Sequence, residues 1–336
     1  MFDPKLSVHR IIAGKLRRYH HLSLWQQLTW PSLMLANIRD ALFVIVGVFQ
    51  SLVMLIVWRP DVVFTKGGFV CLPVGFAAHI LRIPLVIHDS DAHPGLTNRI
   101  LSHWADRIAT GAPLEYYNYN SQKAVYVGIP INSAFRPYSR EEQRVAKAKW
   151  GVSSDDPLVV VTGGGLGAQR INLSVVEHLS KFKKLGSTIL ICGTDNYKEI
   201  KEMVPESTES FFHLYPFVTD MPSLLGAADV VVTRAGATTI LELAALKKAT
   251  VLIPNAKLTG GHQLKNAAVY QKKNALEVID EASLEQSPKE LIKVIQRLLS
   301  ETKETEKMAA RLYSFARPDA AKVMADIIMK VAGRSV

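Results

Sequence analysis

Short runs of apolar residues alternate with longer amphipathic stretches along almost the whole chain. In the first half, runs typical of β-strands cover residues 61–65, 84–88, 106–110 and 124–128. In the second half, they cover residues 158–162, 188–192, 229–233, 250–254 and 277–279. The stretches between them are long enough for helices, and such alternation is typical of parallel β-sheets with helices on their faces. The pattern therefore predicts an α/β fold.

A segment without helix or strand pattern separates the two halves. IPINSAFRPYSREEQ, at residues 129–143, is rich in proline, serine and charge, as interdomain linkers are. We therefore expect domains at 1–135 and 136–320. A final helix is predicted to begin around Pro318 and Asp319, because proline suits the first helical position and aspartate the positive helix end. Its residues 321–336 are expected to pack back on the first domain.

One apolar run is long enough to raise the question of a membrane. Ala41–Trp58 contains no charged residue and reaches the lower limit of about 18 residues for a spanning helix. We interpret it as a helix buried against a sheet, because Gln50 and Ser51 lie in its middle and a strand follows at 61–65. A membrane span is the alternative.

A basic stretch precedes this run. Residues 14–21 read GKLRRYHH, and Trp25 and Trp30 lie nearby. Basic residues beside aromatic ones suit a surface that rests on anionic lipid, at about 1 kcal/mol per Lys or Arg. A solvated charge run explains the same stretch equally well.

Composition narrows the classes of protein and partner. The 336 residues include 40 Lys and Arg against 30 Asp and Glu, a net charge of +10, which favours an anionic partner: nucleic acid, phospholipid or a phosphorylated small molecule. The cysteines, Cys71 and Cys192, lack metal-ligand spacing, so we expect neither disulfide nor zinc, and a reducing cytosol fits. The N-terminus lacks the pattern of a signal peptide.

The most informative motif is the glycine-rich turn Gly163–Ala168, which follows a buried strand and precedes a helix. Glycines there let a phosphate approach the first free N–H groups of the helix. A dinucleotide site would also need an acidic residue about 20 positions further on, but Asp195, the nearest match, lies too far downstream. Close packing of strand and helix requires glycine as well, so this turn alone is weak support for a diphosphate site.

A second strand-to-helix turn supplies groups for a ribose. Thr238 and Thr239 can donate at the helix start, and Glu242 lies one turn into the helix and points back toward it. A carboxylate there can accept bonds from both ribose hydroxyls. Thr239 and Glu242 also have the spacing of a capping box, which would need no ligand.

Polar residues follow other strand ends too. His262, Gln263 and Asn266 follow the strand at 250–254, and ligands of parallel sheets bind outside the carboxyl ends of the strands. In the first domain, His88 and Asp89 end a strand and are candidates for acid-base chemistry, although a structural histidine is the commoner finding.

Taken in order, the motifs resemble those of the MurG family of glycosyltransferases. They are DVVFTKGGFVCLP, IPLVIHDSDAHPGLTNR, VVVTGGGLGAQRIN, FVTDM, TRAGATTILELAA and HQLKNA. The resemblance covers nearly the whole chain. It implies a GT-B fold, with two Rossmann-like domains facing across a cleft, and no metal or other cofactor.

The resemblance also implies a set of donor-site residues in the second domain. Gly165 stands where the family usually has serine, which removes one hydroxyl donor. The loop with Gly163, Gly164, Gly165 and Gly167 is implied to contact the donor diphosphate, and Val218 to lie beside the uracil. Ala237, Thr238 and Thr239 are implied to form the helix start beside the phosphate, with Glu242 as the ribose ligand. His262 and Gln263 are implied to reach the sugar hydroxyls.

The first domain departs further from the family. HDSDAHPGLTNR replaces HEQNAVPGLTNR, so that Asp89 stands for a glutamate and Asp91 for an amide. Asn132 stands where an arginine is usual. With Gly67 and Gly68, Asp91 and Asn132 are assigned to the acceptor or interdomain region. The family's opening GGTGGH loop is not found, so the first sheet is expected to lack two strands and expose an edge. Donor binding should survive this, whereas turnover is left open.

The implied activity is inverting transfer of N-acetylglucosamine from UDP-N-acetylglucosamine to the 4-hydroxyl of undecaprenyl-diphospho-muramyl-pentapeptide. His88 and Asp89 are the candidate bases. The expected location is the cytoplasmic face of the bacterial cell membrane, as a peripheral protein that binds no nucleic acid. Two alternatives stay open: a UDP-sugar transferase of the same architecture with another acceptor, and a nucleotide-sugar or NAD-binding protein without turnover.

Overall fold

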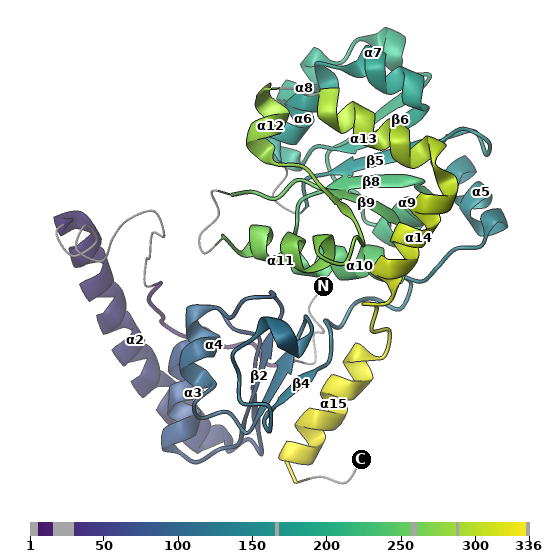
Figure 1. Cartoon of the computed structure of the whole chain (residues 1–336). Helices are drawn as coiled ribbons and strands as arrows, with labels where there is room; N and C mark the ends of the chain where they lie inside the picture. Colours follow the sequence, from purple (N-terminus) through teal and green to yellow (C-terminus); the bar gives the residue numbers. More distant parts are fainter. Residues whose placement is uncertain (1–5, 16–29, 165–167, 257–260, 287–288, 334–336) are drawn as a thin grey trace. The chain divides into compact units, whose positions relative to one another are not determined.

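The computed structural model describes residues 6–15, 30–164, 168–256, 261–286 and 289–333. They form two compact units (Figure 1). The first unit comprises Met1–Val127 together with Ala321–Val336, and the second comprises Gly128–Ala320. Each is built around a parallel β-sheet, so the predicted α/β fold is confirmed.

The first unit contains a four-stranded sheet in the order β1-β2-β3-β4. Its strands are β1 (Val63–Thr65), β2 (Leu85–Asp89), β3 (Arg107–Thr110) and β4 (Ala124–Tyr126). Its helices are α2 (Pro31–Trp58), α3 (Cys71–Ile80), α4 (Leu96–Leu101) and α15 (Ala320–Val331), with a 3-10 turn, η1, at Leu114–Tyr116. Within the described residues β1 pairs only with β2, so one of its sides is an open edge.

The second unit contains a six-stranded sheet in the order β10-β9-β8-β5-β6-β7. Its strands are β5 (Leu158–Thr162), β6 (Ser187–Ile191), β7 (Phe212–Tyr215), β8 (Val230–Thr233), β9 (Ala249–Leu252) and β10 (Glu277–Val278). Counted from β7, the order is that of a nucleotide-binding Rossmann sheet. The chain adds β6 and β7 on one side of β5 and then returns to add β8, β9 and β10 on the other.

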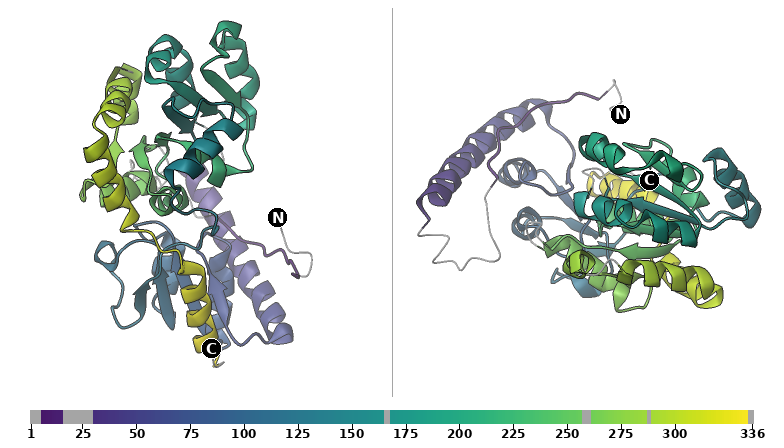
Figure 2. Two further views of the ribbon diagram at one scale, coloured as in Figure 1. Left: turned by 90° about the vertical axis from the view of Figure 1, so that its right-hand side faces the viewer. Right: turned by 90° about the horizontal axis from the view of Figure 1, so that it is seen from above.

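Helices cover both faces of this second sheet (Figure 2). They are α5 (Arg140–Lys149), α6 (Gln169–Val176), α7 (Leu179–Phe182), α8 (Tyr197–Met203), α9 (Met221–Ala227), α10 (Ala237–Ala245), α11 (His262–Gln271), α12 (Glu281–Gln286), α13 (Lys289–Ser300) and α14 (Thr302–Tyr313). Because both faces are covered, every residue of β5 and β8 is buried, which explains why these strands are continuously apolar.

All the strands predicted from the apolar runs are present, with ends shifted by at most two residues. The strand β7 was not predicted from the sequence. Its residues, FHLY, are half-buried apart from Phe212, because β7 is an edge strand. A short strand with little burial leaves little apolar pattern to detect.

The apolar run 41–58 is helical, as predicted, but the prediction that it is buried against a sheet is wrong. It belongs to α2, and Leu33–Trp58 is long and apolar enough to cross a membrane, with only 17% of its most apolar window buried. One side of α2 contacts α3, where Leu55 joins the core of the first unit. The other side exposes Leu35, Ile38, Leu42, Ile45, Val46, Phe49, Val53, Ile56 and Val57. Hydrophobicity alone does not determine what covers a helix.

Gln50, which lies in the middle of this apolar helix, binds a second segment of the chain. Its Oε1 accepts the backbone N–H of Ile12 at 2.9 Å, and its Nε2 donates to the carbonyl of Arg10 at 2.8 Å. Gly47 makes this contact possible, because a Cβ there would lie 2.0 Å from the Ile12 carbonyl oxygen. The extended segment 6–15 therefore lies against α2, which accounts for the polar residue in an apolar run.

Candidate functional site

The carboxyl ends of β5, β8 and β9 bring three loops together. These strands are neighbours, and Thr162 pairs with Thr233, which pairs with Leu252. The direction in which strands are added reverses between β5 and β8, and ligands of open α/β sheets bind outside the strand ends at such a reversal. The loops after these three strands therefore form the candidate site of the second unit.

The loop after β5 holds the predicted glycines. Gly163 is buried, and Gly164 has a φ of +76° and donates its N–H to Thr162 Oγ1 at 3.2 Å. Gly165 and Gly167 lie outside the described residues. Helix α6 begins at Gln169, and no side chain caps it. An uncapped helix start after a glycine turn is a suitable place for an anion.

The loop after β8 leads into α10, which begins at Ala237 with Gly236 as its N-cap and no side-chain cap. Thr238 is exposed, and Thr239 and Ala237 are half-buried. Because Thr239 lies inside the helix, it cannot form a capping box with Glu242, and that alternative is wrong.

Glu242 is a half-buried carboxylate in the second turn of α10. Desolvation raises its pKa above the ordinary value for glutamate. Within the part of the chain that the structure describes, this carboxylate has no hydrogen-bond or ion-pair partner. A carboxylate that is partly desolvated and unpaired is well prepared to accept hydrogen bonds from ligand hydroxyls.

The third loop leads into α11, which His262 and Gln263 open. Gln263 Oε1 accepts the backbone N–H of Asn255 at 2.8 Å, which fixes the side chain against the loop after β9. The buried Asn266 donates to the Ala235 carbonyl at 3.2 Å, which joins this helix to the loop after β8.

Val218 follows β7, two strands from β5 at the same edge of the sheet. It is buried, whereas its neighbour Phe217 is 65% exposed. The described residues that were predicted for the donor site thus all follow strands of one sheet, at or within two helical turns of its carboxyl edge. Those after β5, β8 and β9 lie on adjacent strands, and Val218 lies further along.

A partly buried network of ion pairs lies beneath these loops, and it was not predicted from the sequence. Glu281, the first residue of α12, pairs with Arg234 through Oε1 and with Arg170 through Oε2, the latter at 3.3 Å. Arg234 Nη1 also donates to the Ile253 carbonyl at 3.0 Å. No local pattern identifies residues so far apart in sequence as partners.

In the first unit, the candidate bases are deeply buried. The His88 side chain is fully buried, with Nδ1 3.3 Å from Ser90 Oγ, and Asp89 is 4% exposed. The Tyr119 hydroxyl donates to Asp89 Oδ2 at 2.7 Å. Desolvation outweighs this bond and raises the pKa of Asp89 to about 6. Neither side chain reaches solvent directly, so contact with an acceptor would require local movement.

The other residues predicted for the acceptor or interdomain region belong partly to the first unit and partly to the second. Gly67 and Gly68 have φ of +80° and +84°, and a Cβ on Gly67 would lie 2.9 Å from Asn98 Nδ2. The backbone carbonyl of Asp91 accepts the Tyr117 hydroxyl at 2.7 Å. Asn132 belongs to the second unit, where its Oδ1 accepts the N–H of Ala134 in a turn.

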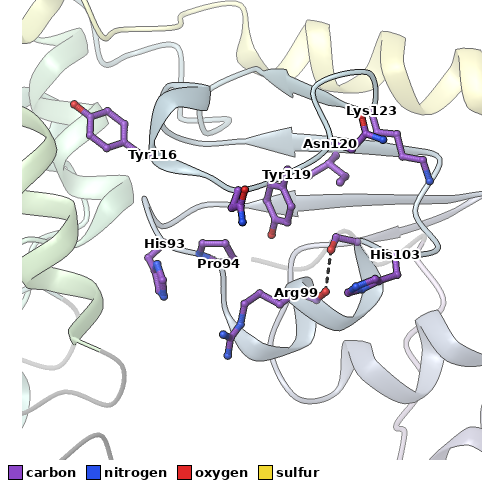
Figure 3. Close-up of a pocket in the computed structure, with 11 residues that line it drawn as sticks. His93, Pro94, Arg99, His103, Tyr116, Tyr119, Asn120 and Lys123 are labelled. Carbon is purple, nitrogen blue, oxygen red and sulfur yellow. Dashed lines mark hydrogen bonds between the residues drawn. The ribbon is translucent and has the colours of Figure 1, made fainter.

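A cavity of about 650 Å³ in the first unit contains none of the predicted site residues (Figure 3). Tyr119 lines it together with Arg99, His103 and Lys123. Tyr119 connects this cavity to the buried Asp89. No group of three or more His, Cys, Asp or Glu side chains suited to a metal ion occurs in the described ranges.

Comparison with known sequences identifies the family. The sequence profile of the glycosyltransferase family 28 C-terminal domain matches residues 158–324, and that of the N-terminal domain matches residues 6–110. A relative in Clostridium kluyveri is 35% identical over 88% of this chain and 78% of its own length. One in Alkaliphilus oremlandii is 38% identical over 85% and 78%. Both are named UDP-N-acetylglucosamine–N-acetylmuramyl-(pentapeptide) pyrophosphoryl-undecaprenol N-acetylglucosamine transferase. The chain belongs to the MurG family of glycosyltransferases.

Solved structures agree with the GT-B fold of this MurG-family chain. Acinetobacter baumannii MurG has a TM-score of 0.68 at 24% identity, covering 87% of this chain and 79% of its own. Neisseria meningitidis UDP-GlcNAc 2-epimerase, solved with UDP-GlcNAc, has a TM-score of 0.63 at 14% identity, with coverage of 86% and 81%. At these identities the likeness concerns the fold alone.

Proposed function

We propose that this MurG-family enzyme transfers N-acetylglucosamine from UDP-N-acetylglucosamine to the 4-hydroxyl of undecaprenyl-diphospho-N-acetylmuramyl-pentapeptide, with inversion and without a metal. One observation carries the donor assignment: Glu242 is unpaired among the described residues and lies in the second turn of α10. The uncapped starts of α10 and α6 follow the two strands between which the strand order reverses. The names of the relatives support both substrates.

The proposed reaction is a single displacement. The acceptor oxygen forms a bond to the anomeric carbon while the bond from that carbon to the diphosphate oxygen breaks. The hydroxyl proton passes to a base, and UDP leaves with the bonding electron pair. Attack opposite to the leaving group inverts the anomeric configuration.

The main demand on the protein is to stabilise charge on the departing UDP. The N-termini of α6 and α10 carry partial positive charge and present backbone N–H groups at the strand ends. Glu242 would hold the ribose and so fix the position of the diphosphate between them. Because these groups do not depend on a metal, turnover is expected to survive EDTA.

Of the two candidate bases, we favour Asp89. Its pKa of about 6 is close to the value that suits a base at neutral pH, and its partner Tyr119 lines a cavity. His88 is fully buried on the sheet, and its Nδ1 lies 3.3 Å from Ser90 Oγ, which does not line that cavity.

We further propose that α2 holds the enzyme on the cytoplasmic face of the membrane, lying in the interface. Its exposed apolar stripe provides the contact surface. A membrane span would carry the backbone of Arg10, bound by Gln50, into the hydrocarbon together with its charged side chain. This favours in-plane binding over the span. Residues 16–21 of the basic stretch, and Trp25, lie outside the described residues.

Titration calorimetry with UDP-N-acetylglucosamine, UDP and NAD tests the donor assignment, and a transfer assay with the lipid-linked muramyl-pentapeptide tests the acceptor. We expect binding of both uridine ligands, no binding of NAD, and formation of the disaccharide lipid. Binding of NAD with indifference to UDP would overturn the proposal. Donor binding without transfer would support the alternative of a different acceptor or a protein without turnover.

A further inference from the structure

A single buried carboxylate joins the elements that carry the three donor-site loops. Glu281 is 4% exposed and lies at the start of α12, which packs against α6 (Figure 1). Its two oxygens bind different arginines, Arg234 through Oε1 and Arg170 through Oε2. The carboxylate thereby connects residues from separate parts of the chain.

The two arginines lie directly next to loops of the proposed donor site. Arg170 is the second residue of α6, directly after the glycine loop that follows β5. Arg234 directly follows β8 and precedes α10, the helix that carries Glu242. Because Arg234 also donates to the carbonyl of Ile253, directly after β9, the network reaches all three loops at the reversal point.

The charges in the network require the carboxylate. Two guanidinium groups meet at one acid, and Arg234 is itself 8% exposed. Without the negative charge, the buried Arg234 guanidinium would keep no ion-pair partner among the described residues and would lose its link to Arg170, whose side chain is 37% exposed. The end of β8 and the start of α6 would then be held together less firmly. Backbone N–H groups that receive a diphosphate must be held close to their working positions, so such a separation would weaken donor binding.

We propose that Glu281 is a positioning residue for the nucleotide-sugar site, which acts through Arg170 and Arg234 without touching the substrate. This inference rests on the proposed donor site. Among the described residues, the side-chain partners of Glu281 and Arg234 all lie in or next to loops of that site, which a role in stability alone would not explain.

A double-mutant cycle on the full chain tests this role by UDP titration calorimetry and by the KM and kcat for UDP-N-acetylglucosamine. The variants are Arg170→Gln, Glu281→Gln and the double variant, with Glu281→Asp as the conservative rescue. Arg140→Gln is the matched control, because Arg140 forms an exposed ion pair with Glu306 at 4.0 Å on the same unit.

We expect Glu281→Gln to weaken UDP binding by about tenfold or more, and Arg170→Gln to weaken it by less. The double variant should bind UDP no more weakly than Glu281→Gln alone, because Arg170 acts through Glu281. KM should rise more than kcat falls, Glu281→Asp should recover part of the affinity, and Arg140→Gln should bind as wild type does. Thermal unfolding verifies that each variant is folded at the assay temperature.

Two results would overturn the positioning role although the wild-type protein binds UDP. One is a loss of UDP affinity in the double variant that equals the product of the losses in the two single variants. The other is wild-type UDP affinity in folded Glu281→Gln. If Glu281→Gln does not fold, Arg170→Gln decides, because it leaves the Arg234 pair intact, and unchanged affinity there would overturn the role. Failure of the wild-type protein to bind UDP would overturn the proposed function and this inference together.

Discussion

Substitution of Glu242 by glutamine separates a ligand-binding carboxylate from a structural one. The substitution preserves the shape of the side chain and removes its charge. Burial raises the pKa of Glu242, and no described residue pairs with it, so its charge contributes no favourable contact to the ligand-free protein. We therefore expect the thermal midpoint of the ligand-free variant to equal or exceed that of wild type.

The expected loss of affinity follows from the bonds to the ribose. A hydrogen bond to a charged acceptor contributes about 1.5–3 kcal/mol, and a ribose offers two hydroxyls to Glu242. Glutamine keeps one acceptor oxygen without the charge, so we expect a loss of about 2–3 kcal/mol, which weakens the dissociation constant for UDP about 30- to 150-fold.

Titration calorimetry with UDP measures this change, and Glu202→Gln, on the exposed surface of α8, is the control. The ratio of wild-type to variant affinity should fall as the pH is lowered through the raised pKa of Glu242, because the protonated acid loses the charge that glutamine lacks. An affinity of Glu242→Gln within about twofold of wild type would refute the reasoning. A lower thermal midpoint without ligand would show that the carboxylate is structural.

Three further predictions concern other parts of the chain. Burial raises the pKa of Asp89 from 3.8 to about 6, so the folded protein binds this proton more tightly than the unfolded one, and stability is lost as the pH rises through that window. In urea unfolding, Asp89→Asn should be about 3 kcal/mol more stable than wild type above about pH 6 and equal to it below about pH 4. A difference in stability that does not change with pH would contradict this. On α2, the double variant Leu42→Glu, Val53→Glu should reduce flotation with anionic vesicles about tenfold or more without changing the circular dichroism spectrum. The control Val145→Glu, at an exposed position of the second unit, should float as wild type does. Flotation of the double variant equal to that of wild type would exclude the α2 stripe as the membrane contact. Gly226→Ala would place a Cβ 2.5 Å from the Tyr138 ring and should lower stability by about 1–3 kcal/mol in thermal unfolding. In the control Gly236→Ala, the added Cβ would lie 3.7 Å from Thr239 Oγ1, so stability should change far less.

The candidate site could be predicted in outline from local sequence. Glycine turns after buried strands place backbone N–H groups at a sheet edge, and the order of the motifs indicated the family. Whether Glu242 caps its own helix or is unpaired could not be predicted in the same way. Thr239 and Glu242 have the spacing of a capping box, and only the observed start of α10 at Ala237 shows that Thr239 lies inside the helix.

By itself, the sequence determined the elements and the fold class. Strands of continuous apolar residues must be buried on both faces, and the stretches between them must cover those faces, which requires parallel sheets with helices. These properties depend on neighbouring residues and therefore leave a periodic pattern in the chain. The edge strand β7 was missed because its half-buried residues leave little pattern.

The tertiary structure alone decided which distant residues meet and which apolar surface stays open. Arg170, Arg234 and Glu281 come together because the strand order reverses between β5 and β8 and α12 returns to α6. The apolar residues of α2 remain exposed because the first unit covers only one side of that helix. Hydrophobicity and charge specify what a residue needs, but the path of the chain specifies which partner is within reach.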